Sequence, residues 1–309
     1  MSAPVAAIDC GTNAIRLLVA QVDDEGTLHE HVRLMQIVRL GEGIDRTGEF
    51  SAEALNRTFA AVDEYADVIR ELGASRTRFV ATSASRDASN RDAFIAGVRR
   101  RLGIDPEVIT GTEEAALSFA GAVRGLPPGR ATPPALVVDI GGGSTEFVLG
   151  GTEPEFSASV DVGCVRMTER HLRDDPPTPA QIAATWADIE AAVAAAGERV
   201  PFADAGCLVG LAGSVTTVAA MAMDLPEYDA SVLHGSVVSA AEVAEVTARL
   251  LAMTRAERAA LPFMHPGRVD IIAGGAMVLQ AAMRAAGADR AIVSETDILD
   301  GIVYTLSPV

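Results

Sequence analysis

Apolar residues along the chain follow two patterns, and each half of the sequence shows them in the same order. Short apolar runs, alternating with polar residues as in 29–38 and separated by glycine-bearing turns, predict strands. Longer stretches in which apolar residues recur every three or four positions predict helices. In the first half these patterns predict strands at 5–9, 15–22 and 27–39, a helix at 51–73, a strand at 77–82, a helix at about 90–102, a strand at 106–110 and a helix from Thr112 to Gly125.

The segment 126–134 interrupts this pattern, because four prolines in nine residues fit neither a helix nor a central strand. After it the order of strands and helices begins again, with capping boxes opening several of the helices. The second half is expected to hold strands at 135–139, 145–150, 156–162, 206–211 and 290–294, and helices from Thr178 to about Gly197, at 214–223, from Ser239, from Thr254, at 268–286 and from Ser294. At 309 residues, the chain is about twice a typical domain. We therefore expect two α/β domains, 1–125 and 135–309, joined by a linker at 126–134.

Composition excludes several classes of function. All 25 basic residues are Arg, which excludes a P-loop with its phosphate-binding Lys and a Lys Schiff base. The formal net charge of −17 argues against nucleic acid as a partner. No apolar run is long enough to span a membrane, and the N-terminus does not resemble a signal peptide. Three cysteines without metal-ligand spacing are typical of a reduced protein, so we expect a cytoplasmic location.

The candidate chemistry lies in a motif that occurs twice: an apolar strand ending in Asp, a turn of glycine and small polar residues, and a second apolar strand. The aspartates are Asp9 and Asp139. The turn residues are Gly11, Thr12 and Asn13 in the first copy and Gly141, Gly142, Gly143, Ser144 and Thr145 in the second. Backbone N–H groups and a carboxylate directed to one place suit a phosphate group and its divalent metal. The first copy alone also fits a plain hairpin turn, but together they predict phosphoryl transfer in a cleft between two related domains.

Three further features fit this chemistry, and each also has a purely structural explanation. Gly213 and Ser214 open a helix whose N-terminal N–H groups suit an anion, although Ser214 can simply cap that helix. Arg86 follows a strand end, where it can bind phosphate or form an ion pair with a nearby acid. Glu113 and Glu114 stand in the first turn of a helix, where acids stabilise the helix dipole and where either can act as a base toward water.

These segments, taken together and in this order, resemble the exopolyphosphatase/guanosine pentaphosphate phosphatase (Ppx/GppA) family over essentially the whole chain. The matching stretches are 7–18, 81–88, 109–115, 138–146 and 210–217. The resemblance implies a duplicated RNase H-like α/β fold of the actin, heat-shock protein and sugar kinase superfamily around a central cleft, with 295–309 returning to the first domain. It also implies Mg²⁺-dependent release of terminal phosphate from inorganic polyphosphate.

The resemblance further implies roles for individual residues. Glu114 is the expected base that activates water, with Glu113 as the adjacent alternative. Asp139 and Glu146 would hold the metal and orient the water, and Asp9 would also bind the metal and belong to the phosphate-binding residues. The two turns, Arg86, and the Gly213–Ser214 segment would bind phosphate. We expect direct in-line attack by water without a covalent phosphoenzyme.

Several alternatives stay open at this point. The residues do not distinguish Mg²⁺ from Mn²⁺, indicate whether K⁺ is needed, or show whether the chain forms a homodimer. The substrate can instead be guanosine pentaphosphate (pppGpp), and the fold also serves ATP-driven kinases and chaperones or a polyphosphate sensor. The chain lacks the helical C-terminal region of longer family members, which leaves processivity open. Where many members read Gly-Leu-Arg-Glu-Gly, residues 297–301 read Asp-Ile-Leu-Asp-Gly.

Overall fold

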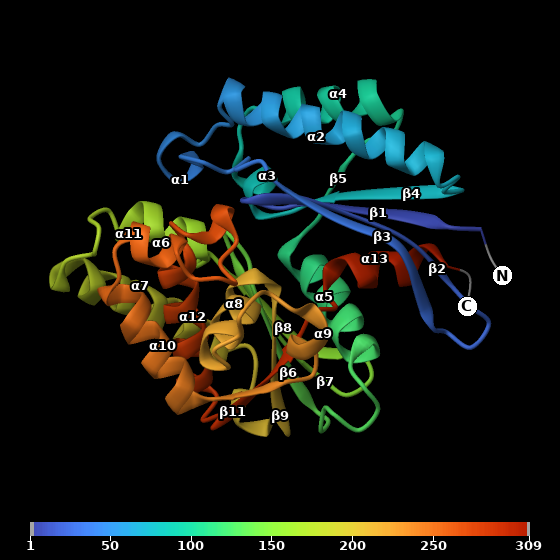
Figure 1. Cartoon of the computed structure of the whole chain (residues 1–309). Helices are drawn as coiled ribbons and strands as arrows, with labels where there is room; N and C mark the ends of the chain where they lie inside the picture. The colour runs from blue at the N-terminus through green and yellow to red at the C-terminus, as the bar shows by residue number, and fades with distance from the viewer. Residues whose placement is uncertain (1–2, 308–309) are drawn as a thin grey trace. The chain divides into compact units, whose positions relative to one another are not determined.

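The computed structural model describes residues 3–307, and its contacts group the chain into two compact units (Figure 1). Unit 1 has two segments, one ending at Gly121 and one beginning at Ile298, whereas unit 2 is the continuous segment Ala122–Asp297. The linker expected at 126–134 therefore lies within unit 2. Of the stretch 295–309, which the resemblance expects to return to the first domain, the part from Ile298 groups with unit 1; residues 308–309 lie outside the described residues.

Unit 1 is built on a five-stranded sheet, counted over its described residues, with the strand order β3-β2-β1-β4-β5. β1 pairs with β2 antiparallel and with β4 parallel. The strands are β1 (Val5–Cys10), β2 (Ala14–Val22), β3 (Leu28–Ile37), β4 (Arg76–Ala81) and β5 (Glu107–Val108). The helices are α1 (Ile44–Thr47), α2 (Ala52–Glu71), α3 (Ser83–Asp87), α4 (Arg91–Leu102), α5 (Gly111–Gly125), which runs past the end of the unit, and α13 (Ile298–Leu306).

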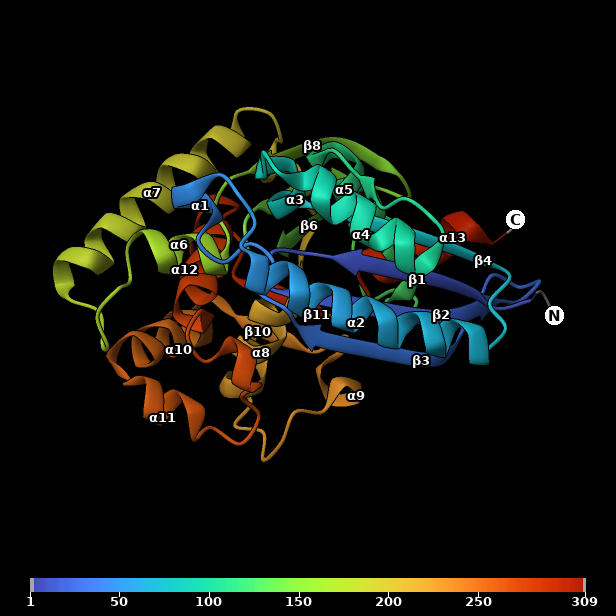
Figure 2. The same cartoon turned by 90° about the horizontal axis from the view of Figure 1, so that it is seen from above.

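The two faces of this sheet bury different side chains, because successive strand residues point to opposite faces. Leu17 and Val19 belong to the core under α2 and α4, whereas Leu18 and Ala20 belong to the core under α13. Figure 2 shows α2 and α4 side by side on the first of these faces. The sheet of unit 1 is thus buried on both sides, and the C-terminal helix supplies the second cover.

An ion pair between the buried Asp300 and Arg33 connects the start of α13 to β3. Asp300 is only 2% exposed, and its Oδ1 accepts a hydrogen bond from Arg33 Nη2 at 2.7 Å. A buried carboxylate is tolerated when it is paired in this way. The next residue, Gly301, allows a close approach to α5, because a Cβ there would lie 2.0 Å from the carbonyl oxygen of Leu117.

Unit 2 repeats this topology. Its six-stranded sheet, again counted over described residues, has the order β10-β11-β9-β6-β7-β8. β6 pairs antiparallel with β7 and parallel with β9, as β1 does with β2 and β4. The strands are β6 (Ala135–Ile140), β7 (Thr145–Gly150), β8 (Pro154–Val160), β9 (Cys207–Leu211), β10 (Val237–Ser239) and β11 (Arg290–Ser294). The helices are α6 (Cys164–Arg170), α7 (Pro179–Gly197), α8 (Ala212–Ala222), α9 (Ala230–Leu233), α10 (Ala240–Ala252), α11 (Arg255–Ala259) and α12 (Ile272–Ala285), with 3₁₀ turns η1 (Phe202–Asp204) and η2 (Pro266–Arg268).

The repeated strand order and pairing confirm the duplicated RNase H-like α/β fold. The capping boxes predicted at Thr178, Ser239 and Thr254 are all formed, and they open α7, α10 and α11. α12 is buried over most of its length and is the centre of the unit 2 core. None of the helices described in residues 3–307 has the length and apolar character needed to cross a bilayer.

Some predicted element starts were wrong. α5 begins at Gly111, because Thr110 Oγ1 accepts the backbone N–H of Glu113 at 3.2 Å; Thr112 lies within the first turn and does not cap it. α12 begins at Ile272 because η2 precedes it. The last helix begins at Ile298, since the Ser294 hydroxyl donates to Thr296 O at 2.8 Å instead of opening a helix.

The contact between α13 and α5 gives a first prediction. Ala is a better helix former than Gly by about 1 kcal/mol, so propensity alone predicts that Gly301→Ala stabilises the protein. The backbone of Leu117 stands in the way, and we expect a net loss of about 1–3 kcal/mol from overpacking. Hydrogen exchange of the β1 and β2 amides measures this loss. Gly151→Ala, where the nearest atom lies 3.8 Å away, is the matched control. Equal hydrogen exchange in Gly301→Ala and Gly151→Ala would contradict the close approach of Gly301 to the Leu117 backbone.

Candidate functional site

The predicted site residues of unit 1 lie at one edge of its sheet. β1, β4 and β5 are parallel neighbours, and their last residues are paired: Cys10 with Ala81, and Ala81 with Val108. The glycine turn after β1, the helix α3 after β4 and the helix α5 after β5 therefore begin side by side. In open α/β sheets this carboxyl edge is where ligands bind.

The segment that follows β3 binds the carbonyl oxygens of the first turn. Gly11 N donates to Ala14 O at 3.0 Å and closes the turn. The carbonyl oxygens of Thr12 and Asn13 accept hydrogen bonds of 2.8–3.1 Å from backbone N–H groups of the segment 38–41. In a trans peptide the N–H points away from the preceding carbonyl. The amides that follow Thr12 and Asn13 are therefore directed to the opposite side, as an anion-binding turn requires.

Buried hydroxyl groups at the same edge also point to a ligand. Thr12 is 5% exposed and Ser85, in α3, is fully buried. Within residues 3–307, Thr12 Oγ1 and Ser85 Oγ have no hydrogen-bond partner. Such orphaned polar atoms are rare in native proteins and mark places where a ligand or water completes the bonding.

Asp9 has a partner that the sequence analysis did not single out. Arg16, the residue opposite it on β2, donates from Nη2 and Nε to Asp9 Oδ2 at 2.7 and 3.1 Å. Asp9 is 5% exposed, so this pairing compensates a buried charge. Cys10 beside it is a buried filler: burial, and secondarily the Asp9 charge, raises the pKa of its thiol well above the usual value.

The structure separates the two candidate bases. Glu114 is 8% exposed, and its Oε2 accepts from Arg86 Nη1 at 2.6 Å. Arg86, in α3, also donates to Ile109 O at 3.2 Å, so the acid partner expected for it is Glu114. Glu113 is much more exposed and accepts from Arg78 Nη2 at 2.8 Å. Glu114 therefore belongs to the sheet edge that carries Arg86, whereas Glu113 belongs to a surface ion pair.

The second turn, in unit 2, repeats the one-sided arrangement. Gly141 N donates to Ser144 O at 3.0 Å, as Gly11 does to Ala14. The first backbone N–H groups of α6 donate to the carbonyl oxygens of Gly141 and Gly142 at 2.9–3.1 Å. Arg166, itself in α6, donates from Nε to Gly143 O at 2.7 Å. The amides of residues 142–144 consequently point away from α6.

The residue before α6 packs directly against the triple glycine. A Cβ on Gly163, the residue before α6, would lie 2.5 Å from the carbonyl carbon and oxygen of Gly142. The side chains of the turn are used internally, since Thr145 Oγ1 donates to Val162 O at 2.5 Å and Ser144 Oγ donates to Glu146 Oε1 at 2.7 Å. An anion would therefore meet backbone N–H groups here and not these hydroxyls.

The carboxylates of unit 2 lie on neighbouring strands. Asp139 on β6 is directly opposite Glu146 on β7, and the two are 8% and 1% exposed. Glu146 Oε1 also accepts from Ser159 Oγ at 2.8 Å, which orients it. Among the described residues no three His, Cys, Asp or Glu side chains form a metal-binding group. Mg²⁺ is commonly held by one or two carboxylates together with substrate phosphates, and this pair fits that requirement.

The third glycine segment is a strand-to-helix turn at the same edge of unit 2. Ala212 has φ +69°, a conformation uncommon for a residue with a side chain. Ser214 makes no cap; its hydroxyl is packed so closely that a Cβ on Gly275 would lie 2.2 Å from it. Only the backbone of this segment is placed to meet an anion.

Arg268 is a cation at this turn that the sequence analysis missed. Its guanidinium lies 2.5 Å from where a Cβ on Gly213 would stand, and its Nη1 donates to Thr217 Oγ1 at 3.1 Å. It also lies over the ring of Tyr228, 5.8 Å from the centroid. Burial, followed by the charge of Glu295, raises the pKa of Tyr228 to about 12, so Tyr228 is a neutral hydrogen-bond donor at physiological pH.

Comparison with known proteins identifies relatives over nearly the whole chain. The model of the Ppx/GppA phosphatase family matches residues 18–308. Exopolyphosphatase 2 of Mycobacterium tuberculosis is 49% identical over 315 residues, which cover 98% of each chain. A guanosine-5'-triphosphate,3'-diphosphate pyrophosphatase of Vibrio cholerae is 37% identical over 179 residues, which cover 56% of this chain and 35% of that protein.

Solved structures give the same result. A crystal structure of an exopolyphosphatase-like protein matches with a TM-score of 0.94 and 44% identity, covering 99% of this chain and 98% of the other. The Aquifex aeolicus member of the Ppx/GppA family matches with a TM-score of 0.82 and 28% identity over 98% of this chain and 97% of the other.

The contact between Gly163 and Gly142 yields a prediction for anion binding. We expect Gly163→Ala to displace the second turn and to misdirect at least one N–H donor. A hydrogen bond to a charged group contributes about 1.5–3 kcal/mol, so affinity for inorganic tripolyphosphate should fall about 10- to 100-fold. Isothermal titration measures this affinity, again with Gly151→Ala as control. Unchanged affinity in Gly163→Ala would show that the second turn does not bind the anion.

Proposed function

Because the chain belongs to the Ppx/GppA phosphatase family, we propose that it is an exopolyphosphatase, which hydrolyses the terminal phosphate from inorganic polyphosphate. The observation that carries this proposal is the repeated turn whose carbonyl oxygens are bound on one side, so that its amides face the other. Two such turns suit a substrate with several phosphate groups. The relative of nearly equal length, Exopolyphosphatase 2, supports this substrate over a nucleotide.

We assign the base to Glu114. Arg86 fixes its carboxylate at 2.6 Å, and its buried position lies at the sheet edge that also carries the first turn. In this scheme Glu114 accepts a proton from the water that attacks the terminal phosphorus in line, and the turn amides stabilise the charge that develops on the phosphate oxygens. Arg86 and Arg268 add positive charge, and the Asp9–Arg16 pair orients the first turn. We propose that both sheet edges are needed for the reaction.

We place the metal at Asp139 and Glu146, and the hydroxyl groups of Ser144 and Ser159 orient Glu146. A divalent cation bound there would neutralise charge on phosphate oxygens. Mg²⁺ is our assignment, with Mn²⁺ as a substitute; a K⁺ requirement and a homodimer stay predictions. All three cysteines are free, in keeping with a reducing compartment such as the cytoplasm.

The base assignment predicts a split between turnover and binding. Glu114→Gln keeps the shape and the Arg86 contact but does not accept the proton, so kcat should fall about 10²- to 10⁴-fold. The affinity for polyphosphate should change little. Glu113→Gln is the matched control, because it alters the neighbouring carboxylate in the same helical turn, and it should keep nearly full turnover. Steady-state phosphate release tests both variants. Full activity of Glu114→Gln, or loss of activity in Glu113→Gln alone, would refute the assignment.

A substrate panel tests the proposed function itself. We expect a higher kcat/KM for phosphate release from inorganic polyphosphate than from pppGpp, and no phosphate transfer from ATP to added sugars. The Vibrio cholerae relative makes pppGpp the second candidate. Release from pppGpp with the higher kcat/KM would replace the proposal with that activity, and tight polyphosphate binding without any release would indicate a sensor.

A further inference from the structure

The segment that carries Arg268 lies between α11 and α12 and contains only the short 3₁₀ turn η2. Its regular hydrogen bonding is therefore sparse, and its position depends on side chains from neighbouring elements. His265 begins the turn, with its Nδ1 accepting from Gly267 N at 3.1 Å. The guanidinium of Arg268 meets Gly213 only if this segment stays in place.

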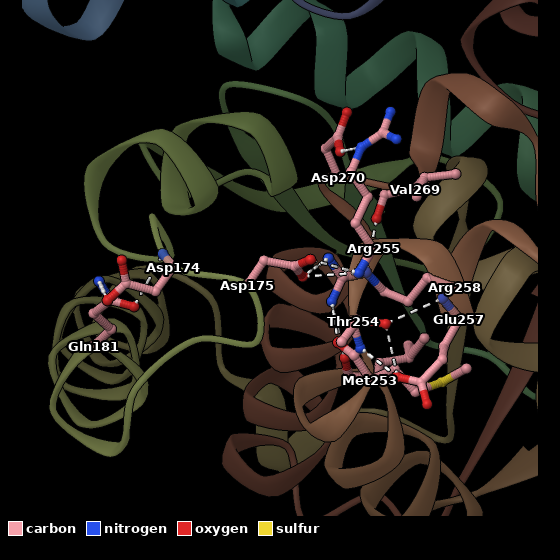
Figure 3. A network of polar contacts seen from close by, with 11 residues as sticks. Asp174, Asp175, Gln181, Met253, Thr254, Arg255, Glu257, Arg258, Val269 and Asp270 are labelled. Carbon is pink, nitrogen blue, oxygen red and sulfur yellow. Dashed lines mark hydrogen bonds and ion pairs between the residues drawn. The ribbon is translucent and has the colours of Figure 1, made fainter.

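Arg258 in α11 holds the residue after Arg268 (Figure 3). The Arg258 side chain is buried, at 6% exposure for the residue, and its Nε donates to Val269 O at 2.9 Å. Its Nη1 donates to Met253 O at 2.7 Å, just after the end of α10. One guanidinium therefore connects the Arg268 segment to the end of a long helix.

Asp175, from the loop between α6 and α7, completes this arrangement. Its Oδ1 accepts from Arg258 Nη2 at 3.0 Å and from the backbone N of Arg255 at 2.8 Å. Arg255 in turn donates from Nε to Asp270 Oδ1 at 2.6 Å. Both residues that follow Arg268, Val269 and Asp270, are thus held by α11, and Asp175 holds α11 (Figure 3).

We propose that Asp175 and Arg258 are positioning residues that set Arg268 for binding the phosphate chain of the substrate. The inference rests on the proposed function, because it needs a polyphosphate that Arg268 contacts. Asp175 and Arg258 do not touch that substrate. They act by fixing the backbone next to Arg268. Their contribution to substrate affinity therefore depends on the Arg268 guanidinium and is lost when that group is removed.

A double-mutant cycle tests this dependence. Affinity for tripolyphosphate is measured by isothermal titration in the inactive Glu114→Gln background, alone and with Asp175→Asn, Arg268→Ala, or both. We expect Asp175→Asn to weaken binding about tenfold in the presence of Arg268. In the Arg268→Ala variant, adding Asp175→Asn should cause no further loss of affinity. Asp175 is part-exposed, so its neutral variant is expected to fold, and Asp175→Glu should recover part of the affinity.

Asp188→Asn is the matched control. Asp188 also holds arginine and histidine side chains in unit 2, accepting from Arg170 at 2.7 Å and His171 at 2.8 Å. Its removal should lower thermal stability without changing affinity. In the active enzyme, Asp175→Asn should raise KM for tripolyphosphate more than it lowers kcat.

Three results would overturn the proposal. The first is an equal loss of affinity from Asp175→Asn with and without the Arg268 side chain, and the second is an Asp175→Asn variant of lower thermal stability but unchanged affinity. The third is an Asp188→Asn variant whose affinity falls as much as that of Asp175→Asn. Failure of the proposed function has a different signature. A wild-type enzyme that binds tripolyphosphate but releases no phosphate would refute the hydrolysis and leave the binding cycle valid. Absence of binding by the parent protein would overturn both.

Discussion

The constraint on which the site depends is the one-sided hydrogen bonding of the two glycine turns. In unit 1 the backbone of 38–41 binds the turn carbonyl oxygens, and in unit 2 the first residues of α6 do so. A peptide whose carbonyl is bound on one side must present its N–H on the other. Most of these carbonyl oxygens are bound by backbone N–H groups, and Arg166 Nε binds that of Gly143. The two turns have different residues but share the same closing bond, Gly11 N to Ala14 O and Gly141 N to Ser144 O.

Because the chain is acidic, the placement of its arginines determines where it can attract an anion. With a net charge of −17, the mean field of the protein repels a polyanion, so positive charge has to be local and fixed. Arg86 is fixed by Glu114, and Arg16 by Asp9. Arg166 is fixed by Gly143 O. The guanidinium group suits this use because its donors form a rigid fork that can bind protein and phosphate oxygens together.

The sequence allowed the long elements and the repeated motif to be predicted, because both are local. Ser51 caps α2 where expected, with Ser51 Oγ accepting from Ala54 N at 3.1 Å, and the Asp139–Glu146 register follows from a hairpin of known length. The short helices α3 and α6 were missed, since their five and seven residues span too few turns to show a period and no side-chain cap marks their start, whereas the five-residue α11 was predicted from its capping box. These are the helices that place Arg86 and bind the triple glycine. Arg268 was missed for another reason: its contact with Gly213 joins segments far apart in the sequence, through an irregular stretch without a motif.

The C-terminal helix shows how a departure from the family pattern is absorbed. Residues 297–301 read Asp-Ile-Leu-Asp-Gly, so Leu299 stands where the resemblance expects Arg. Leu299 is 1% exposed and belongs to the core of unit 1, while the next residue, Asp300, is paired with Arg33 of β3. A charged side chain at position 299 would have to be buried in that core, which is costly without a partner. The segment therefore packs α13 against its sheet through buried Leu299 and through the Asp300–Arg33 pair.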